Sequence, residues 1–192
     1  SSTSRGLGDV YKRQLINLGV VVEKMGNDLM VYGADKSFPI KKSELHLGNA
    51  GTAFRPLSAV LSFMNGRYKL SGVNRMHERP IKDLVDSLIL MGASINYLKK
   101  DGFPPLLIHP PSNKSCDEIT VKGNVSSQFL TAILMAAPLL QNPLSIRVEG
   151  DLVSKPYIHI TLKLLEKFGI RYQNDNWQQF TLNNISVSYT HL

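Results

Sequence analysis

The pattern of apolar and polar positions along the chain repeats with a period of about 75 residues. Three segments end an apolar, helix-like stripe on a glycine and continue as a strand-like run, which a polar turn and a second strand-like run follow. These segments are residues 15–22, 89–95 and 166–172, with the glycines at positions 19, 92 and 169. Glycine just after a helix can adopt a positive φ without Cβ strain, so it closes the last turn. The pattern therefore predicts a helix leading into a β-hairpin, three times.

Two further pairs of segments keep the same period. They are residues 48–54 with 123–129, and Arg79-Pro80 with Lys155-Pro156. Each opens an apolar helix pattern, and proline is tolerated at the first helical position because its missing N–H would be unpaired there anyway. The helix expected over residues 80–91 carries a stripe that predicts burial of Ile81, Leu84, Val85 and Leu88.

Alternating helix and strand patterns place the chain in the α/β class. The unit is a strand, a polar loop, a helix, a strand, a basic loop, a helix and a hairpin, and the chain holds about two and a half such βαβαββ units. Residues 1–14 and 187–192 share nothing with the repeat, so we expect a non-native or unstructured leader and tail that pack poorly; variable natural termini are the alternative. The repeat itself is assigned to residues 15–186.

Composition narrows the class of protein further. Hydrophobic residues make up 43% of the chain and charged residues 19%, which is typical of a globular domain with a sizeable core. No apolar run is long enough to span a bilayer, and no cleavable signal pattern opens the chain. The single cysteine, Cys116, excludes an internal disulfide framework and fits a reducing compartment.

The net charge of +7 allows three interpretations. The chain could bind nucleic acid, or it could bind a small anion that carries phosphate or carboxylate. Alternatively, a more acidic part of a longer protein could balance this positive charge. The basic residues are scattered, without the long runs or interleaved aromatic residues typical of single-strand binding.

Small and polar residues precede four of the expected helices. The groups are Gly51-Thr52 with Arg55 and Pro56, Ser126-Ser127-Gln128, Ser154-Lys155-Pro156-Tyr157, and Arg75 with Arg79. Helix N-termini offer unpaired N–H groups and attract anions, and guanidinium groups bind carboxylate or phosphate bidentately. Serine and threonine at such positions are more often simple N-caps. Four donor-rich helix starts in one repeated scaffold nevertheless suggest anion-binding ends that converge on one face.

No general acid or base stands out in the sequence. His46, His77, His109 and His159 are scattered, and there is no carboxylate pair with catalytic spacing. Zinc-type spacing, a P-loop and a dinucleotide fingerprint are also absent from the sequence. The sequence thus predicts binding groups without the groups that perform the chemistry.

Four motifs in these loops resemble the 5-enolpyruvylshikimate-3-phosphate synthase family. They are residues 47–57, 75–81, 125–131 and 150–158, and they occur in the family's order from about Leu15 to about Leu182. The resemblance implies a protein of two similar domains, each built from three βαβαββ units. It also implies transfer of an enolpyruvyl group from phosphoenolpyruvate to the 5-hydroxyl of shikimate 3-phosphate, with release of phosphate and with no metal or organic cofactor.

The resemblance assigns roles to individual residues. Those implied for phosphoenolpyruvate are Gly51, Arg79 and Gln128, and those for shikimate 3-phosphate are Ser126, Ser127, Gln128, Ser154 and Tyr157. Asn49, Thr52, Arg55 and Pro56 would support them. The family's first strand, its lysine-serine-arginine loop and the second domain with its acid–base groups have no counterpart in this sequence. We therefore expect no catalytic residue in this chain and no activity from the chain alone. His159 stands where relatives often carry aspartate.

The resemblance further implies a monomeric, cytoplasmic parent enzyme without nucleic-acid or membrane partners. Two alternatives stay open at this point. One is a relative of UDP-N-acetylglucosamine enolpyruvyl transferase, although Cys116 lacks the glycine-rich context of that enzyme's mobile cysteine loop. The other is a non-catalytic repeat module that binds anions or RNA, whose affinity should fall steeply with salt.

Overall fold

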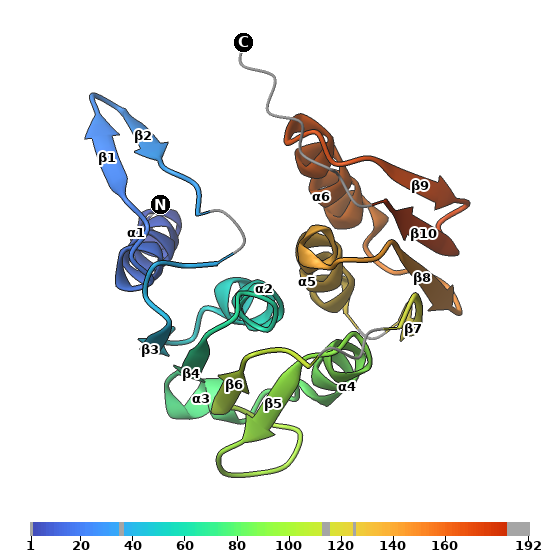
Figure 1. Ribbon diagram of the computed structural model, residues 1–192, viewed down its shortest axis with the longest axis horizontal. Helices are drawn as coiled ribbons and strands as arrows, with labels where there is room; N and C mark the ends of the chain where they lie inside the picture. The colour runs from blue at the N-terminus through green and yellow to red at the C-terminus, as the bar shows by residue number, and fades with distance from the viewer. Residues whose placement is uncertain (1, 35–36, 113–115, 125, 184–192) are drawn as a thin grey trace.

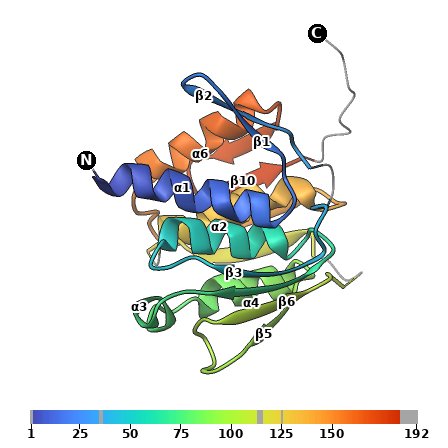
Figure 2. The same cartoon turned by 90° about the vertical axis from the view of Figure 1, so that its left-hand side faces the viewer.

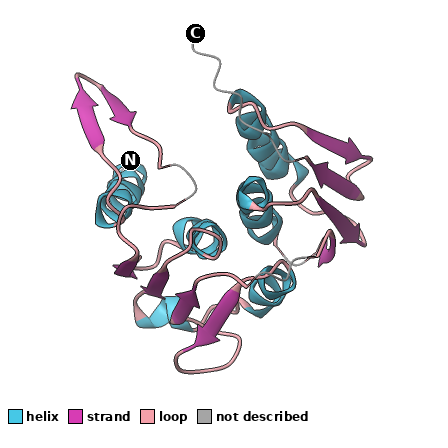
Figure 3. Cartoon of the chain, viewed as in Figure 1, coloured by secondary structure: helices cyan, strands magenta, loops and turns pink. Residues whose placement is uncertain are grey.

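The computed structural model describes residues 2–34, 37–112, 116–124 and 126–183. Helices gather on the inside of the molecule and strands on the outside (Figure 1), as colouring by secondary structure also shows (Figure 3). Figure 1 views most helices nearly end-on, and the view turned by 90° shows α1, α2 and α6 lengthwise (Figure 2). This arrangement confirms the expected α/β class.

Two complete units follow one another along the chain. The first contains β3 (Lys42–His46), α2 (Gly51–Leu61), β4 (Arg67–Ser71), the short α3 (Asn74–His77), α4 (Lys82–Leu90), β5 (Ser94–Tyr97) and β6 (Leu106–His109). The second contains β7 (Glu118–Lys122), α5 (Ser127–Ala136), the 3-10 turn η1 (Ala137–Leu139), β8 (Leu144–Glu149), α6 (Lys155–Lys167), β9 (Tyr172–Asp175) and β10 (Gln179–Leu182). An incomplete unit of α1 (Ser2–Asn17), β1 (Val22–Met25) and β2 (Asp28–Val31) precedes them.

The two complete units share one sheet topology. Their strand orders are β3-β4-β6-β5 and β7-β8-β10-β9, and in each sheet the first pair is parallel and the other two pairs are antiparallel. The loops repeat as well, because the Val73 N–H donates to the Gly48 carbonyl at 3.1 Å and the Val153 N–H donates to the Gly123 carbonyl at 3.1 Å. The repeat of about two and a half units is therefore confirmed.

The core lies between the helices and the inner faces of the sheets. β7 and β8 alternate buried with more exposed residues, because successive side chains point to opposite faces of a sheet. The predicted stripe on α4 is confirmed, since Ile81, Leu84, Val85 and Leu88 are all buried. α2 packs directly against α5, and this contact brings the N-terminal ends of the two helices together.

The start of α4 differs from the prediction. The helix begins at Lys82, so Pro80 is not its first residue. Ile81 is the N-cap, with a φ of −136° that is not helical, and its N–H donates to the Gly102 carbonyl at 2.9 Å. Pro156 does lie in the first turn of α6, as expected.

Residues 1–14 and 187–192, outside the repeat, were expected to form a non-native or unstructured leader and tail that pack poorly. α1 begins at Ser2, so the segment expected to be unstructured is helical for most of its length. Gln14 is buried and its Nε2 donates to the His46 carbonyl at 3.1 Å, while Val10 is partly buried against the core. Whether this segment is native stays a prediction, and the expected tail, residues 187–192, lies outside the described residues.

Alanine at Gly72 should destabilise the fold. A Cβ there would lie 2.3 Å from the Gly48 carbonyl oxygen and 2.8 Å from the Met76 Cβ. The clash with the Gly48 carbonyl involves backbone, which cannot rotate away, so we expect Gly72→Ala to lower the free energy of unfolding by roughly 1–3 kcal/mol. Urea denaturation measures the change. Gly33→Ala is the matched control, because a Cβ at Gly33 would meet nothing within 4 Å. Equal midpoints for the two variants would contradict the prediction.

Candidate functional site

Two arginine side chains flank the first residue of α2. A Cβ on Gly51 would lie 2.6 Å from Nη1 of Arg79 and 2.7 Å from Nη1 of Arg55. Glycine is therefore required for both guanidinium groups to approach this backbone so closely. Arg55 comes from the second turn of α2 and Arg79 from the loop between α3 and α4.

Arg55 connects α2 to α5. Its Nη1 donates to Oε1 of Gln128 at 2.9 Å, across 73 positions of sequence. Its Cζ also lies 5.4 Å from the centroid of the Phe129 ring, within the range of a cation–π interaction. The structure thus brings together four residues of the predicted site, namely Gly51, Arg55, Arg79 and Gln128.

The charge of Arg55 has no carboxylate partner. The side chain is 8% exposed, and the ion pairs among the described residues lie elsewhere, on Lys69, Lys82, Arg147 and Lys163. Burial first, and the positive charge of Arg79 second, lower the pKa of Arg55 to about 10. Arg55 therefore stays charged at neutral pH, and a buried, unpaired cation is a strong attractor for an anion.

Ser126 has the N-capping role that serine most often has before a helix. It is the N-cap of α5, and its Oγ accepts from the Gln128 backbone N–H at 3.2 Å. The capping interpretation is therefore right for this serine. It does not hold at the starts of α2 and α6, where Ala50 and Ser154 make no side-chain cap hydrogen bond. Ser127 and Gln128 open α5, half-buried beside Ser126.

Ser154 and Tyr157 lie one helix further on. Thr131 of α5 and Thr161, midway along α6, share a hydrogen bond at 3.3 Å, and the two helices pack side by side. Ser154 adopts a left-handed conformation with φ of 58°, and Tyr157 is 67% exposed. The described contacts do not join either side chain to Gly51, Arg79 or Gln128, so the structure places them beside that group rather than in it.

The supporting residues shape the start of α2. Pro56 lies inside this helix and lacks an N–H, so it leaves the Thr52 carbonyl without its usual intrahelical donor. The Tyr11 hydroxyl of α1 donates to that carbonyl instead. Thr52 and Asn49 have exposed side chains, and the Asn49 carbonyl accepts the Gly51 N–H at 3.0 Å.

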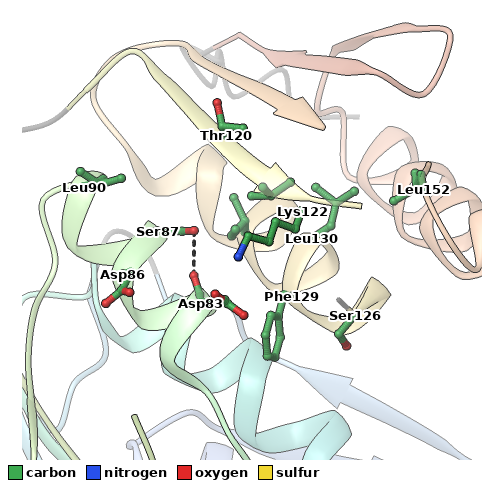
Figure 4. Close-up of a pocket in the computed structure, with 12 residues that line it drawn as sticks. Asp83, Asp86, Ser87, Leu90, Thr120, Lys122, Ser126, Phe129, Leu130 and Leu152 are labelled. Carbon is green, nitrogen blue, oxygen red and sulfur yellow. Dashed lines mark hydrogen bonds between the residues drawn. The ribbon is translucent and has the colours of Figure 1, made fainter. Parts of the chain in front are cut away.

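A hollow of about 170 Å³ lies behind the start of α5, between α4 and β7 (Figure 4). Asp83 and Asp86 of α4 face Lys122 of β7 across it, and Ser126 and Phe129 form one edge. Two carboxylates at its rim repel anions, so the hollow does not suit an anionic ligand. Arg55, which does not line this hollow, lies over the ring of Phe129.

Cys116 does not have the properties of a reactive thiol. Burial, and to a smaller extent the charge of Asp117, raise its pKa, whereas nucleophilic cysteines have lowered pKa values. This disfavours the alternative that depends on a reactive cysteine loop. Among the described residues, no cluster of three histidine, cysteine or acidic side chains could hold a metal ion, and no helix is long and apolar enough to cross a membrane.

His77 anchors the loop that carries Arg79, a role that the sequence did not indicate. Its Nε2 accepts the Gly72 N–H at 3.2 Å, at the turn where β4 leads into α3. The pKa of His77 is lowered, first by desolvation and then by the positive charges of Lys99 and His46. Protonation at Nε2 would remove the acceptor of the Gly72 bond.

The stability of the fold should therefore depend on the charge of His77. Because its pKa is lower in the folded than in the unfolded state, the stabilisation is complete above about pH 6.5 and is lost as the pH falls from there through the folded pKa. We expect the melting temperature of the wild type to fall more between pH 7.5 and pH 5 than that of His77→Gln, which does not titrate. Melting curves at several pH values measure this. His159→Gln, exposed on α6, is the control, and parallel curves for wild type and His77→Gln would contradict the prediction.

Comparisons with known proteins agree with the motifs and the fold. A family model described as EPSP synthase (3-phosphoshikimate 1-carboxyvinyltransferase) matches residues 11–187. The chain is 53% identical over 169 residues to the 3-phosphoshikimate 1-carboxyvinyltransferase of Cellvibrio japonicus, covering 88% of the chain and 40% of the relative. It is also 53% identical over 176 residues to that of Cupriavidus taiwanensis, covering 90% of the chain and 41% of the relative.

Solved structures show the same fold. An EPSP synthase structure from Acinetobacter baumannii matches with a TM-score of 0.74 and 22% identity, over 92% of this chain and 39% of that chain. The chain thus spans about 40% of the length of the relatives that it matches.

Proposed function

The chain belongs to the EPSP synthase family, and from this membership we propose that it forms a substrate-binding part of an enolpyruvyl transferase. The proposed reaction of the whole enzyme joins phosphoenolpyruvate to shikimate 3-phosphate in the synthesis of aromatic amino acids. The bond between the enol carbon and the phosphate oxygen breaks, and an ether bond forms to the 5-hydroxyl. Inorganic phosphate leaves with the hydroxyl proton, so no oxidant or reductant is needed.

The observation that carries this proposal is the pair of guanidinium groups at Gly51. Arg55 and Arg79 lie close to the same glycine, and no ion pair among the described residues neutralises either of them. Two cations so placed repel each other unless an anion lies between or beside them. Phosphoenolpyruvate carries both a phosphate and a carboxylate, which arginine binds bidentately.

In this proposal Gly51, Arg79 and Gln128 hold phosphoenolpyruvate, with Asn49, Thr52, Arg55 and Pro56 maintaining the shape of the loop. The starts of α5 and α6 hold shikimate 3-phosphate through Ser126, Ser127, Gln128, Ser154 and Tyr157. The packing of α5 against α6 supports this division, because it makes the two helices that carry these donors neighbours. Helix N-termini stabilise phosphate groups.

We also propose that residues 15–186 form the family fold. The whole enzyme is then a monomer in the cytoplasm. The single cysteine fits a reducing compartment.

Titration of the 192-residue chain with each substrate tests the proposal. We expect calorimetry or NMR to detect binding of phosphoenolpyruvate and of shikimate 3-phosphate. Gly51→Ala should weaken phosphoenolpyruvate binding about tenfold, because the methyl group would displace both guanidinium groups; tenfold corresponds to about 1.4 kcal/mol. Gly33→Ala, remote from any neighbour, should bind as the wild type does. Absence of binding, or equal losses in the two variants, would rule out this site.

A further inference from the structure

Arg55 makes a contact that determines how the Gln128 side chain is oriented. Its Nη1 is 2.9 Å from the carboxamide of Gln128, and the contact is partly buried between α2 and α5. A guanidinium group carries five N–H donors and no acceptor. Only the carboxamide oxygen of Gln128 can therefore face Arg55, and the NH₂ group must point the other way.

Arg55 is held firmly enough to impose this orientation. It is 8% exposed, and the Phe129 ring lies 5.4 Å from its Cζ. With a pKa of about 10 it remains a cation at neutral pH, so it donates throughout the physiological range. Charge-assisted hydrogen bonds are roughly twice as strong as neutral ones.

The backbone of Gln128 is occupied as well. Its N–H donates to Oγ of Ser126, which fixes the first turn of α5 beneath the side chain. The two N–H bonds of the carboxamide are then the donors that Gln128 presents to a ligand. Phosphate, carboxylate and hydroxyl oxygens all accept such bonds, whereas a flipped carboxamide would present an oxygen that repels an anion.

We propose that Arg55 is a positioning residue that fixes the Gln128 carboxamide with its NH₂ group toward the bound anion. This inference rests on the proposed function for the identity of that anion, phosphoenolpyruvate. Arg55 acts through Gln128, and its own contact with the ligand is not required.

A double-mutant cycle tests the proposal. The variants are Arg55→Met, Arg55→Lys, Gln128→Ala and the double variant Arg55→Met with Gln128→Ala, titrated with phosphoenolpyruvate. We expect Arg55→Met and Gln128→Ala each to weaken binding about tenfold. The double variant should bind about as well as the weaker-binding of the two single variants, since the effects of substituting two residues that act together are not additive. Arg55→Lys, which keeps a charged donor, should recover part of the affinity. Arg67→Met removes the same charge from an exposed position at the start of β4 and should change affinity less than about twofold.

The side-chain NH₂ resonances of Gln128 give a second reading without any ligand. In the wild type they should differ from those of a solvent-exposed glutamine, move toward them in Arg55→Met, and return part of the way in Arg55→Lys. A purely structural role for Arg55 would be reported by melting curves, and it would not single out these resonances.

The positioning role of Arg55 and the proposed function can fail separately. Fully additive losses, or unchanged Gln128 resonances in Arg55→Met, would overturn the positioning role. If the wild type binds no phosphoenolpyruvate, the proposed function fails, and the ligand-free spectra still decide whether Arg55 orients Gln128. If Arg55→Met does not fold, the affinity and the Gln128 resonances of Arg55→Lys are compared with those of the wild type instead.

Discussion

Replacing Arg79 with alanine is expected to weaken phosphoenolpyruvate binding by roughly 10- to 150-fold, while shikimate 3-phosphate binding changes less than about threefold. The range follows from the loss of hydrogen bonds to a charged group, worth about 1.5–3 kcal/mol. Arg79 is half-buried beside Gly51, and its guanidinium has no carboxylate partner among the described residues. A bidentate contact with a phosphate or carboxylate is therefore available to it.

Calorimetric titration of the 192-residue chain with each substrate separates the two effects. Arg75→Ala is the matched control, because Arg75 is an exposed arginine on the adjoining α3. It removes the same charge and should weaken binding only slightly, since exposed charges are screened by solvent and salt. Equal affinities in wild type and Arg79→Ala would remove Arg79 from the site. Equal losses in Arg75→Ala would show a general effect of charge in place of a specific contact.

The fold was largely predictable from the sequence because it repeats. Glycines 19, 92 and 169 all have positive φ and each ends a helix before a strand, as their spacing predicted. The alternation of apolar residues then fixed which faces are buried. α4 begins two residues after Pro80, because Ile81 takes the non-helical conformation of an N-cap, which the preference of proline for a first helical turn does not reveal.

The candidate site was predictable only in part. The sequence identified the donor-rich helix starts, because small residues before an apolar stripe are a local signal. The bond from Arg55 to Gln128 joins residues 73 positions apart, and it depends on how α2 packs against α5. Periodicity does not encode such a contact between helices, nor the bond from Gly72 to His77 that supports the Arg79 loop. The roles of Ser154 and Tyr157 stay predictions.

The chain alone is expected to bind substrates and to release no phosphate from them. Enolpyruvyl transfer requires protonation of the enol carbon, removal of the hydroxyl proton and stabilisation of a tetrahedral intermediate. Positioned acid–base groups contribute typically about 10²–10⁴ in rate. The groups gathered at Gly51 are hydrogen-bond donors, and Asp83 and Asp86 face the hollow, which Arg55 does not line. The chain spans about 40% of the length of its relatives, and we expect the exclusion of water by domain closure to need the remaining length.

Phosphate release from the purified chain, given both substrates, measures this directly, with a full-length 3-phosphoshikimate 1-carboxyvinyltransferase as the control. We expect the rate of the chain to lie at least about 10²-fold below that of the control, as the loss of positioned acid–base groups requires. Binding of phosphoenolpyruvate, followed in the same preparation, distinguishes a folded chain that lacks catalytic groups from one that has not folded. Addition of the remaining segments of a relative should restore turnover if the missing groups lie there, and should do so less well with Arg79→Ala. Turnover by the chain alone near that of the control would show that its own side chains supply the acid and the base.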